Sequence, residues 1–301
     1  TLVKKLLLLP VKKIIIIDNL DYGDITNLEV ESCEKTEISF FKIDLGNTSV
    51  EELSVILEGC DYIFHLAAEK HNQSIENPKK VIDVNISGTF ALYKAAIKTG
   101  VTKIIFSSTL YVYGRNSSPP YSENGKSFPN TIYGISKFTS ELFGAFFSSK
   151  GILDVINLRY LFVYGPRQFA NQGYKSVIVK NFERIIKGMP PIIFGGGEQV
   201  LDYIYVEDVV NYTIQSIILP SDIGPINVCS GNGISIRELT FKMIQIASYS
   251  GEIEYAESDS TQNSFRVGDP TKLKSILSID SITPIEEGLK RTYDWIKKRN
   301  G

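Results

Sequence analysis

A tyrosine and a lysine four residues apart are the first side chains in this sequence that could do chemistry. They are Tyr133 and Lys137, in the segment TIYGISKFTSE at 131–141, which predicts a helix. At this spacing the phenol and the ammonium group share one helix face, with Cβ atoms about 5–6 Å apart. A phenol with an ordinary pKa near 10 is only about 0.1% ionised at pH 7. A neighbouring ammonium ion favours the phenolate, so the two side chains could form a general base.

A predicted strand with hydroxyl-bearing residues at its end precedes this helix. The segment VTKIIFSSTLYVYG, 101–114, is an apolar run that continues into Ser107, Ser108 and Thr109. A strand followed by a helix in this way could bring a side-chain hydroxyl close to the phenol.

A second pair, Tyr293 and Lys297 in YDWIK, has the same spacing. The sequence holds 16 tyrosines, so a chance match is expected. This pair lies in a predicted amphipathic terminal helix, and no strand with hydroxyl-bearing residues comes before it. We therefore assign the chemistry to Tyr133 and Lys137.

The first half of the chain alternates apolar runs with amphipathic stretches, which is typical of a parallel sheet covered by helices. The expected strands lie at 12–17, 37–43, 61–67, 102–108 and 153–159, and the expected helices at 49–58, 78–99 and 131–149. This pattern predicts an α/β fold with a Rossmann-like, doubly wound parallel sheet over residues 1–160.

Residues 161–301 predict a smaller α/β domain that shapes a substrate pocket, with parts of 200–230 returning to the first sheet. The expected helices are SVIVKNFERIIKG and the ranges 234–247, 270–277 and 284–298, and the expected strands are PPIIF and DYIYV. The glycines of GGGEQ, 195–197, precede a strand and not a helix, so we interpret them as a turn and not as a phosphate-binding loop.

Composition excludes several classes of function. The net charge is -2 and the basic residues are scattered, so we expect no nucleic acid or membrane partner. Cys33, Cys60 and Cys229 lie far apart, which indicates reduced thiols in a cytoplasmic protein. With only His65 and His71 beside them, we expect no metal site.

The sequence resembles a known family, the extended short-chain dehydrogenases/reductases of the NAD-dependent epimerase/dehydratase type that act on nucleotide sugars. UDP-glucose 4-epimerases are the familiar members of this family, and the resemblance covers nearly the whole chain. Its motifs come in the family's order: IIIIDNL, FFKIDL, IFHLAAEKH, NISGT, IIFSSTLYVYG, IYGISK, LRYLFVYGPRQ, GGGEQVLDYIYVEDV, INVCSG and IEEGL.

The resemblance implies NAD as cofactor and a set of residues that bind it. Asp18 and Asn19 correspond to the contacts of the adenosine ribose, where a carboxylate would repel the extra phosphate of NADP. The other implied cofactor-binding residues are Asp44, Leu45, Leu66, Ala67, Ala68, Lys70, Asn85, Ser107, Tyr133, Lys137 and Tyr160.

The resemblance also implies a mechanism on a nucleotide-diphosphate sugar. Tyr133 takes the proton of a sugar hydroxyl, at C4, while the carbon gives hydride to NAD, and the hydride returns to the other face of the transient ketone. Lys137 lowers the pKa of the tyrosine, and Thr109 positions the reacting oxygen. The implied substrate-binding residues are Thr109, Tyr133, Phe162, Arg167 and Arg266.

Other reactions of the family stay open as alternatives. The family's 4,6-dehydratases carry Asp-Glu directly after the catalytic threonine, where this chain has Leu110 and Tyr111, so we expect an epimerase before a dehydratase. Phe162 and Leu201 replace an amide and an arginine that contact the substrate in epimerases, which predicts a different sugar or binding mode. A reductase and a non-catalytic NAD(H)-binding protein are the further alternatives.

Two expectations concern the chain's ends and its assembly. In the family, a strand and a GxxGxxG turn precede a stretch such as TLVKKLLLLP, so we expect a chain without its first strand and glycine loop, which binds NAD weakly. The helices at 78–99 and 131–149 pair between subunits in the family, which implies a homodimer.

Overall fold

The structure, a computed structural model, describes residues 1–28, 35–114, 118–168, 175–258 and 264–300. Cys33 lies outside the described residues. The chain divides into two units, each continuous in space but not in sequence. Unit 1 comprises residues 1–118, 123–160 and 210–226, and unit 2 comprises residues 119–122, 161–209 and 227–301.

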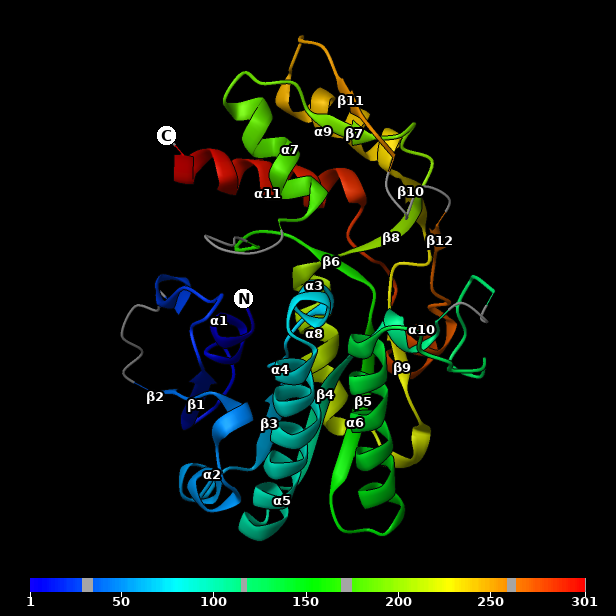
Figure 1. The fold of residues 1–301 in the computed structure, drawn as a ribbon. Helices are drawn as coiled ribbons and strands as arrows, with labels where there is room; N and C mark the ends of the chain where they lie inside the picture. The colour runs from blue at the N-terminus through cyan, green and yellow to red at the C-terminus, as the bar shows by residue number, and fades with distance from the viewer. Residues whose placement is uncertain (29–34, 115–117, 169–174, 259–263, 301) are drawn as a thin grey trace. The chain divides into compact units, whose positions relative to one another are not determined.

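Unit 1 contains two sets of hydrogen-bonded strands (Figure 1). In the first, β1 (Lys13–Asp18) pairs with β2 (Glu37–Lys42) in parallel. The second has the order β3 (Tyr62–His65), β4 (Lys103–Thr109), β5 (Asp154–Tyr160) and β9 (Ile226–Val228), and the boundary of the unit falls within β9. Among the described strands, β1 and β3 are each hydrogen-bonded on one side only.

The helices of unit 1 follow the strands in the order that a parallel sheet requires. They are α1 (Leu2–Leu6), α2 (Val50–Ile56), α3 (His71–Glu76), α4 (Pro78–Ile82), α5 (Thr89–Thr99) and α6 (Ile132–Ser149), and α8 (Val206–Gln215) crosses the boundary between the units. Short 3₁₀ turns lie at Ile25–Leu28, Leu45–Asn47, Leu110–Val112, Ser216–Ile218 and Ser221–Ile223. Local sequence explains the helix ends, since Ser49 and Glu52 form a capping box and Gly100 ends α5 in a left-handed conformation.

The core of unit 1 forms around β4. Every residue of β4 is buried, as expected for a central strand of a parallel sheet that helices cover. One cluster joins Phe106 of β4 to Tyr93 of α5 and Phe147 of α6. The core therefore fixes the two helices against the strand whose end carries Thr109.

The expected single helix at 78–99 is interrupted. A π-helical turn, Asp83–Gly88, separates α4 from α5. At Gly88 an added Cβ would lie 2.6 Å from the carbonyl oxygen of Leu45, so only glycine allows the turn to pass this close to the chain after β2. Such turns are frequent at functional sites.

Unit 2 is built from short strands and four helices. Three strands pair with β8 (Val200–Tyr205): β6 (Phe162–Tyr164), β10 (Gly233–Ser235) and β12 (Phe265–Arg266). Separately, β7 (Ile192–Phe194) pairs with β11 (Glu254–Ala256). The helices are α7 (Val177–Ile186), α9 (Ile236–Ala247), α10 (Thr271–Leu277) and α11 (Ile285–Asn300). The core joins α7, α9 and α11 through Phe182, Leu239 and Leu289.

Apart from the interrupted helix at 78–99, the predicted elements are present with small shifts at their ends, and the predicted α/β, Rossmann-like class is confirmed. The turn expected at GGGEQ lies between β7 and β8. None of the described helices has the length and apolar character needed to cross a membrane.

Candidate active site

Tyr133 and Thr109 meet where β4 ends and α6 begins. The side chain of Thr131 accepts a hydrogen bond from Gly134 N at 3.0 Å and caps α6, which puts Tyr133 in the first turn. An added Cβ at Gly134 would lie 2.5 Å from the carbonyl oxygen of Tyr111, so glycine lets α6 start against the turn that follows β4. The side chains of Tyr133 and Thr109 are hydrogen-bonded. The structure thus brings together the predicted base and the predicted sugar-positioning hydroxyl.

Lys137 follows one helical turn later and is almost fully buried, at 2% exposed. Its ammonium group lies 4.2 Å from the centroid of the Phe106 ring. Burial lowers the pKa of Lys137 to about 7, against the opposing charge of Glu141. Burial therefore brings the titration of Lys137 from the strongly basic range toward neutral pH.

The pKa of Tyr133 departs from the sequence argument. Desolvation raises the pKa of Tyr133 to about 12, while the hydrogen bond to Thr109 acts in the opposite direction and Tyr111 adds to the rise. The sequence argument expected a lowered pKa, because it counted the attraction of nearby cations and left out the cost of burying a phenolate. A second cation beside the phenol would be needed to bring the pKa of Tyr133 below its ordinary value.

The rings of His71 and Tyr111 extend the site beyond the base. His71 stacks on Tyr111 with ring centroids 4.7 Å apart, and Tyr111 contacts Tyr133 edge to face at 5.7 Å. His71 is the first residue of α3. The rings of His71, Tyr111 and Tyr133 therefore lie in a row of contacts that includes the candidate base.

The segment after β3 holds Leu66, Ala67, Ala68 and Lys70, four of the predicted cofactor contacts. Leu66 is 45% exposed, and Ala67 and Lys70 are exposed as well. These residues follow the carboxyl end of β3, which is the edge of a parallel sheet where ligands bind. Their contact with the cofactor stays a prediction.

Asn85, a predicted cofactor contact, lies in the π-helical turn with its side chain hydrogen-bonded within the protein. It is 2% exposed. Its side chain accepts a hydrogen bond from Glu69 N at 2.8 Å and donates to Glu69 O at 2.9 Å and to Ser136 Oγ at 3.0 Å. Both amide hydrogens are used, so Asn85 ties the segment after β3 to the helix that carries the base. Contact with the cofactor itself stays a prediction.

The ends of β1 and β2 lie side by side, because Asp18 pairs in register with Lys42. Asp18 is exposed and accepts a hydrogen bond from Leu20 N at 2.7 Å, and Asn19 accepts from Asp21 N at 3.1 Å. These side chains lie at the strand end, as the ribose prediction requires.

Asp44 and Leu45, the predicted adenine contacts, differ in orientation. Asp44 caps the following turn by accepting from Gly46 N at 2.9 Å, and it lines an open pocket of about 470 Å³ together with Ile43, Asn47, Thr48, Glu52, Val55 and Ile56. Leu45 is 7% exposed and packs in the core with Leu53 and Leu92. Its side chain is therefore packed away from solvent, and contact of Leu45 with an adenine ring stays a prediction.

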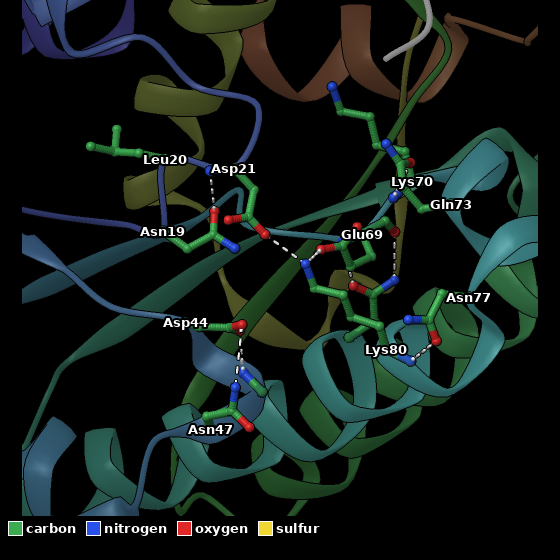
Figure 2. Close-up of polar contacts among 12 residues, drawn as sticks. Asn19, Leu20, Asp21, Asp44, Asn47, Glu69, Lys70, Gln73, Asn77 and Lys80 are labelled. Carbon is green, nitrogen blue, oxygen red and sulfur yellow. Dashed lines mark hydrogen bonds and ion pairs between the residues drawn. The ribbon is translucent and has the colours of Figure 1, made fainter. Parts of the chain in front are cut away.

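Lys80 of α4 joins the segments that follow β1 and β3, and Figure 2 shows it between two carboxylates. Its ammonium group lies 2.6 Å from Asp21 and 2.9 Å from Glu69. These bonds raise the pKa of Lys80, with Asp21 as the larger cause. Sequence reasoning missed this contact, because Asp21 lies 59 residues away and no motif marks it.

Ser107 and Tyr160, the remaining predicted cofactor contacts, lie on β4 and β5. Ser107 is buried at 8% exposed. Tyr160 pairs in register with Thr109, and its hydroxyl lies 2.7 Å from Thr213 Oγ1. This bond directs the Tyr160 hydroxyl to α8.

The predicted substrate contacts Phe162, Arg167 and Arg266 belong to unit 2. Phe162 contacts the ring of Tyr203 at 5.8 Å within the core of the unit. Arg167 is partly exposed and has φ of 67°. Arg266 is partly exposed on β12, next to β8. Their contact with a substrate stays a prediction.

Buried Asp202 holds the chain around Arg266. It is fully buried and accepts hydrogen bonds from Ser230 N at 2.9 Å, Gly231 N at 2.9 Å and Gly268 N at 3.2 Å. Burial raises the pKa of this carboxyl group, and the hydrogen bonds act in the opposite direction. Asp202 thus fixes the position of the segment that carries Arg266.

The residues of unit 1 fit the two ends of an NAD molecule. The exposed carboxylate of Asp18 suits a ribose diol, and the ammonium group of Lys137 is a hydrogen-bond donor of the kind that a ribose hydroxyl accepts. Among the described residues, no glycine-rich turn from a strand into a helix is present for the pyrophosphate. The described part of the chain also holds no cluster of three or more His, Cys, Asp or Glu side chains that could bind a metal ion.

Three similarities to known proteins agree with this geometry. The UDP-glucuronate 4-epimerase of Thermodesulfobacterium geofontis is 32% identical over 297 residues, covering 95% of this chain and 89% of that protein. The crystal structure of a UDP-glucose 4-epimerase with UDP-glucose, from Thermotoga maritima, is 31% identical with a TM-score of 0.91, covering 100% of this chain and 95% of that one. A UDP-N-acetylglucosamine 4-epimerase from Methanobrevibacter ruminantium, solved with UDP-N-acetylmuramic acid, is 31% identical with a TM-score of 0.90, covering 99% and 94%.

A family model confirms the resemblance seen in the sequence. Residues 1–228 match the model described as the NAD dependent epimerase/dehydratase family. The cofactor expected from the motifs, NAD, is the one in this description. The chain belongs to the NAD dependent epimerase/dehydratase family.

Proposed function

We propose that this protein is an NAD-dependent nucleotide-sugar epimerase that inverts a sugar carbon, C4, through a transient ketone. The observation that carries the proposal is the hydrogen bond between Tyr133 and Thr109, with Lys137 one helical turn away and buried. The family relationship and the similarity to 4-epimerases support the same reaction.

The residues of the chain perform the proton chemistry. Tyr133 accepts the proton of the sugar hydroxyl as the ketone forms and returns it when the alcohol forms again on the other face. Thr109 donates to or accepts from the reacting oxygen and holds it at the phenol. Lys137, when charged, stabilises the phenolate. NAD, when bound, accepts the hydride of the oxidation and supplies it for the reduction.

The proposed cofactor contacts are residues of unit 1 at or just after the ends of β1, β2 and β3. Asp18 and Asn19 hold the adenosine ribose, and the exposed segment from Leu66 to Lys70 lies beside the nicotinamide end. A carboxylate at Asp18 favours NAD over NADP, because it repels a 2′-phosphate. The open pocket that Asp44 lines supports the proposal of an adenine site there.

The proposed substrate is a nucleotide-diphosphate sugar, bound with the help of Arg167 and Arg266. Arginine suits a diphosphate because its planar guanidinium group donates two parallel hydrogen bonds. Leu110 and Tyr111 follow Thr109 where a 4,6-dehydratase needs an acid and a base. Tyr111 lies against Tyr133 and supplies an aromatic wall there.

The experiment that tests the proposal is a panel of UDP-, GDP- and dTDP-sugars with NAD⁺ and the full chain, with products identified by NMR. We expect the C4 epimer of at least one sugar, without loss of water and without net change in NAD⁺. A 4-keto-6-deoxy product would indicate a dehydratase. Stoichiometric consumption of NADH or NADPH would indicate a reductase, and no turnover would support a non-catalytic NAD(H)-binding protein.

We also propose a homodimer in which a second copy covers one face of α5 and α6. The support is a row of exposed apolar side chains on these adjacent helices of unit 1 (Figure 1). The row comprises Phe90 at 41% exposed, Ile132 at 39%, Ile135 at 47%, Leu142 at 54% and Phe146 at 54%. Exposed apolar surface of this kind is typical of an interface between proteins.

A cytoplasmic location is the remaining part of the proposal. The Cys60 thiol donates to the carbonyl of Tyr62 at 3.2 Å, as a reduced thiol does. Burial raises the pKa of this thiol, which keeps it unreactive. A reduced thiol is the common state in the cytoplasm.

A further inference from the structure

A buried ion pair joins Glu141, on the helix that carries the candidate base, to Arg159. Glu141 of α6 accepts two hydrogen bonds from the guanidinium group of Arg159 on β5, from Nε at 3.0 Å and from Nη2 at 2.7 Å. Glu141 is 4% exposed and Arg159 is 3% exposed. This bidentate geometry fixes the carboxylate in one position.

The helix register puts this carboxylate next to Lys137. Tyr133, Lys137 and Glu141 follow one another at intervals of four residues on α6, so their side chains lie along one face of the helix. The three residues thus form a row of phenol, ammonium and carboxylate along α6, and Arg159 donates to the carboxylate at the end of this row.

The other titratable groups around Lys137 are neutral at pH 7. His65 of β3 is buried, and desolvation lowers its pKa to about 3, so the imidazole carries no charge. Tyr93 of α5 is fully buried, and desolvation raises its pKa far above neutrality. Tyr133 on the same helix has a pKa raised to about 12. Among the described neighbours, Glu141 is the charged group that acts on Lys137, and Arg159 is bonded to Glu141.

We propose that Glu141, held in place by Arg159, is a positioning residue that keeps the ammonium charge of Lys137 next to Tyr133. Burial against the ring of Phe106 favours neutral lysine, and the carboxylate favours charged lysine. Arg159 prevents the carboxylate from turning to Lys137 and forming a direct ion pair, which would take the ammonium group away from the phenol. The inference rests on the proposed function for its role in catalysis.

The test is a direct titration of Lys137 in the full chain, without NAD or sugar. Lysine labelled with ¹³C at Cε reports the charge of each side chain by NMR, and the variant Lys137→Arg assigns the signal. We expect the wild-type lysine to titrate near neutrality and the lysine of Glu141→Gln to titrate about one pH unit lower or more. Glu141→Asp keeps the charge and should stay close to the wild type.

A second variant covers the case in which Glu141→Gln does not fold because Arg159 is left without its partner. In Glu141→Gln/Arg159→Gln both charges are removed together, which proteins often tolerate. Lys137 should again titrate lower than in the wild type. An unchanged Lys137 titration in either folded variant would overturn the inference, and so would a wild-type Lys137 that is already neutral at pH 5.5.

A second readout separates this inference from the proposed function. If the wild type epimerises a sugar nucleotide, the alkaline limb of its pH–rate profile should move to lower pH in Glu141→Gln and return in Glu141→Asp. A structural role alone would lower the rate without moving that limb. If the wild type turns over no sugar nucleotide, the proposed function fails while the titration still decides the role of Glu141.

Discussion

The side chain of Thr109 at the end of β4 is hydrogen-bonded to the hydroxyl of Tyr133 in the first turn of α6. The two residues are 24 positions apart in the sequence, and the bond joins the end of β4 to the start of α6. It also lowers the pKa of Tyr133, against the larger effect of desolvation. The bond therefore contributes both to the geometry and to the acidity of the base.

Removal of this hydroxyl should reduce epimerisation and move its pH dependence. In Thr109→Val we expect kcat/KM at pH 7 to fall by about tenfold to a hundredfold, the usual cost of a hydrogen bond to a charged group. The pKa of Tyr133 rises when the bond is lost, so the acidic limb of the pH–rate profile should move to higher pH. Thr109→Ser keeps the hydroxyl and should keep the pH–rate profile of the wild type. Equal pH–rate profiles for Thr109→Val and Thr109→Ser would contradict this role of the hydroxyl.

Burial of neutral His65 should make the protein less stable in mild acid. Its folded pKa of about 3 lies below the ordinary value of 6.5, so its contribution to stability is complete above pH 6.5 and decreases as the pH falls toward 3. Between pH 7 and pH 5 we expect a loss of roughly 2 kcal/mol of unfolding free energy from this residue. His65→Gln should remove that loss in urea unfolding at the two pH values.

His71 is the matched control for that measurement, because it is the other histidine of the chain. It is only partly buried, and His71→Gln makes the same substitution at a position outside the buried site of His65. The same acid sensitivity in His65→Gln and in the wild type would contradict a buried neutral imidazole.

Charge on the exposed face of α6 should dissociate the proposed homodimer. Leu142→Asp/Phe146→Asp places two carboxylates in a row of apolar side chains, and we expect a monomer by light scattering. Ile218→Asp is the control, since Ile218 is 84% exposed in unit 1 and lies outside that row. A monomeric wild type, or a dimer that survives both substitutions on α6, would contradict the assigned interface.

A strand and a GxxGxxG turn placed before Thr1 should strengthen NAD binding. The free edges of β1 and β3 each offer backbone groups for one more parallel strand. The amides of such a turn would bind the pyrophosphate at a helix N-terminus. We expect calorimetry to show weak NAD binding by the 301-residue chain and a gain of tenfold or more, about 1.4 kcal/mol, in the extended chain. Tight binding by the unextended chain would contradict this expectation.

The sequence points to a candidate base because the signals for it are local. Helix spacing and the preceding strand identify Tyr133, Lys137 and Thr109, and the segment TIYGISKFTSE already contains Glu141. Its partner Arg159 lies 18 residues further on, and the ion pair depends on the packing of α6 against β5. A local pattern cannot reveal that contact.

Side-chain direction limits what a motif can show in the cofactor region. Leu45 matches a predicted adenine contact by position, yet its side chain packs in the core because Asp44 caps the turn and directs it inward. Asn85 matches a predicted cofactor contact, yet its amide is used between Glu69 and Ser136. In both cases the motif predicts a position along the chain, and the orientation of the side chain depends on tertiary contacts.

The central claim is that Tyr133 is the base of a nucleotide-sugar epimerase, and a matched pair of variants tests it most directly. Tyr133→Phe removes one hydroxyl at the candidate site, and Tyr293→Phe removes one from the other Tyr–Lys pair, on α11. With the best sugar nucleotide of the panel, we expect Tyr133→Phe to lower kcat by about a hundredfold or more and Tyr293→Phe to leave it within about twofold. Epimerisation by Tyr133→Phe at the wild-type rate would contradict the account.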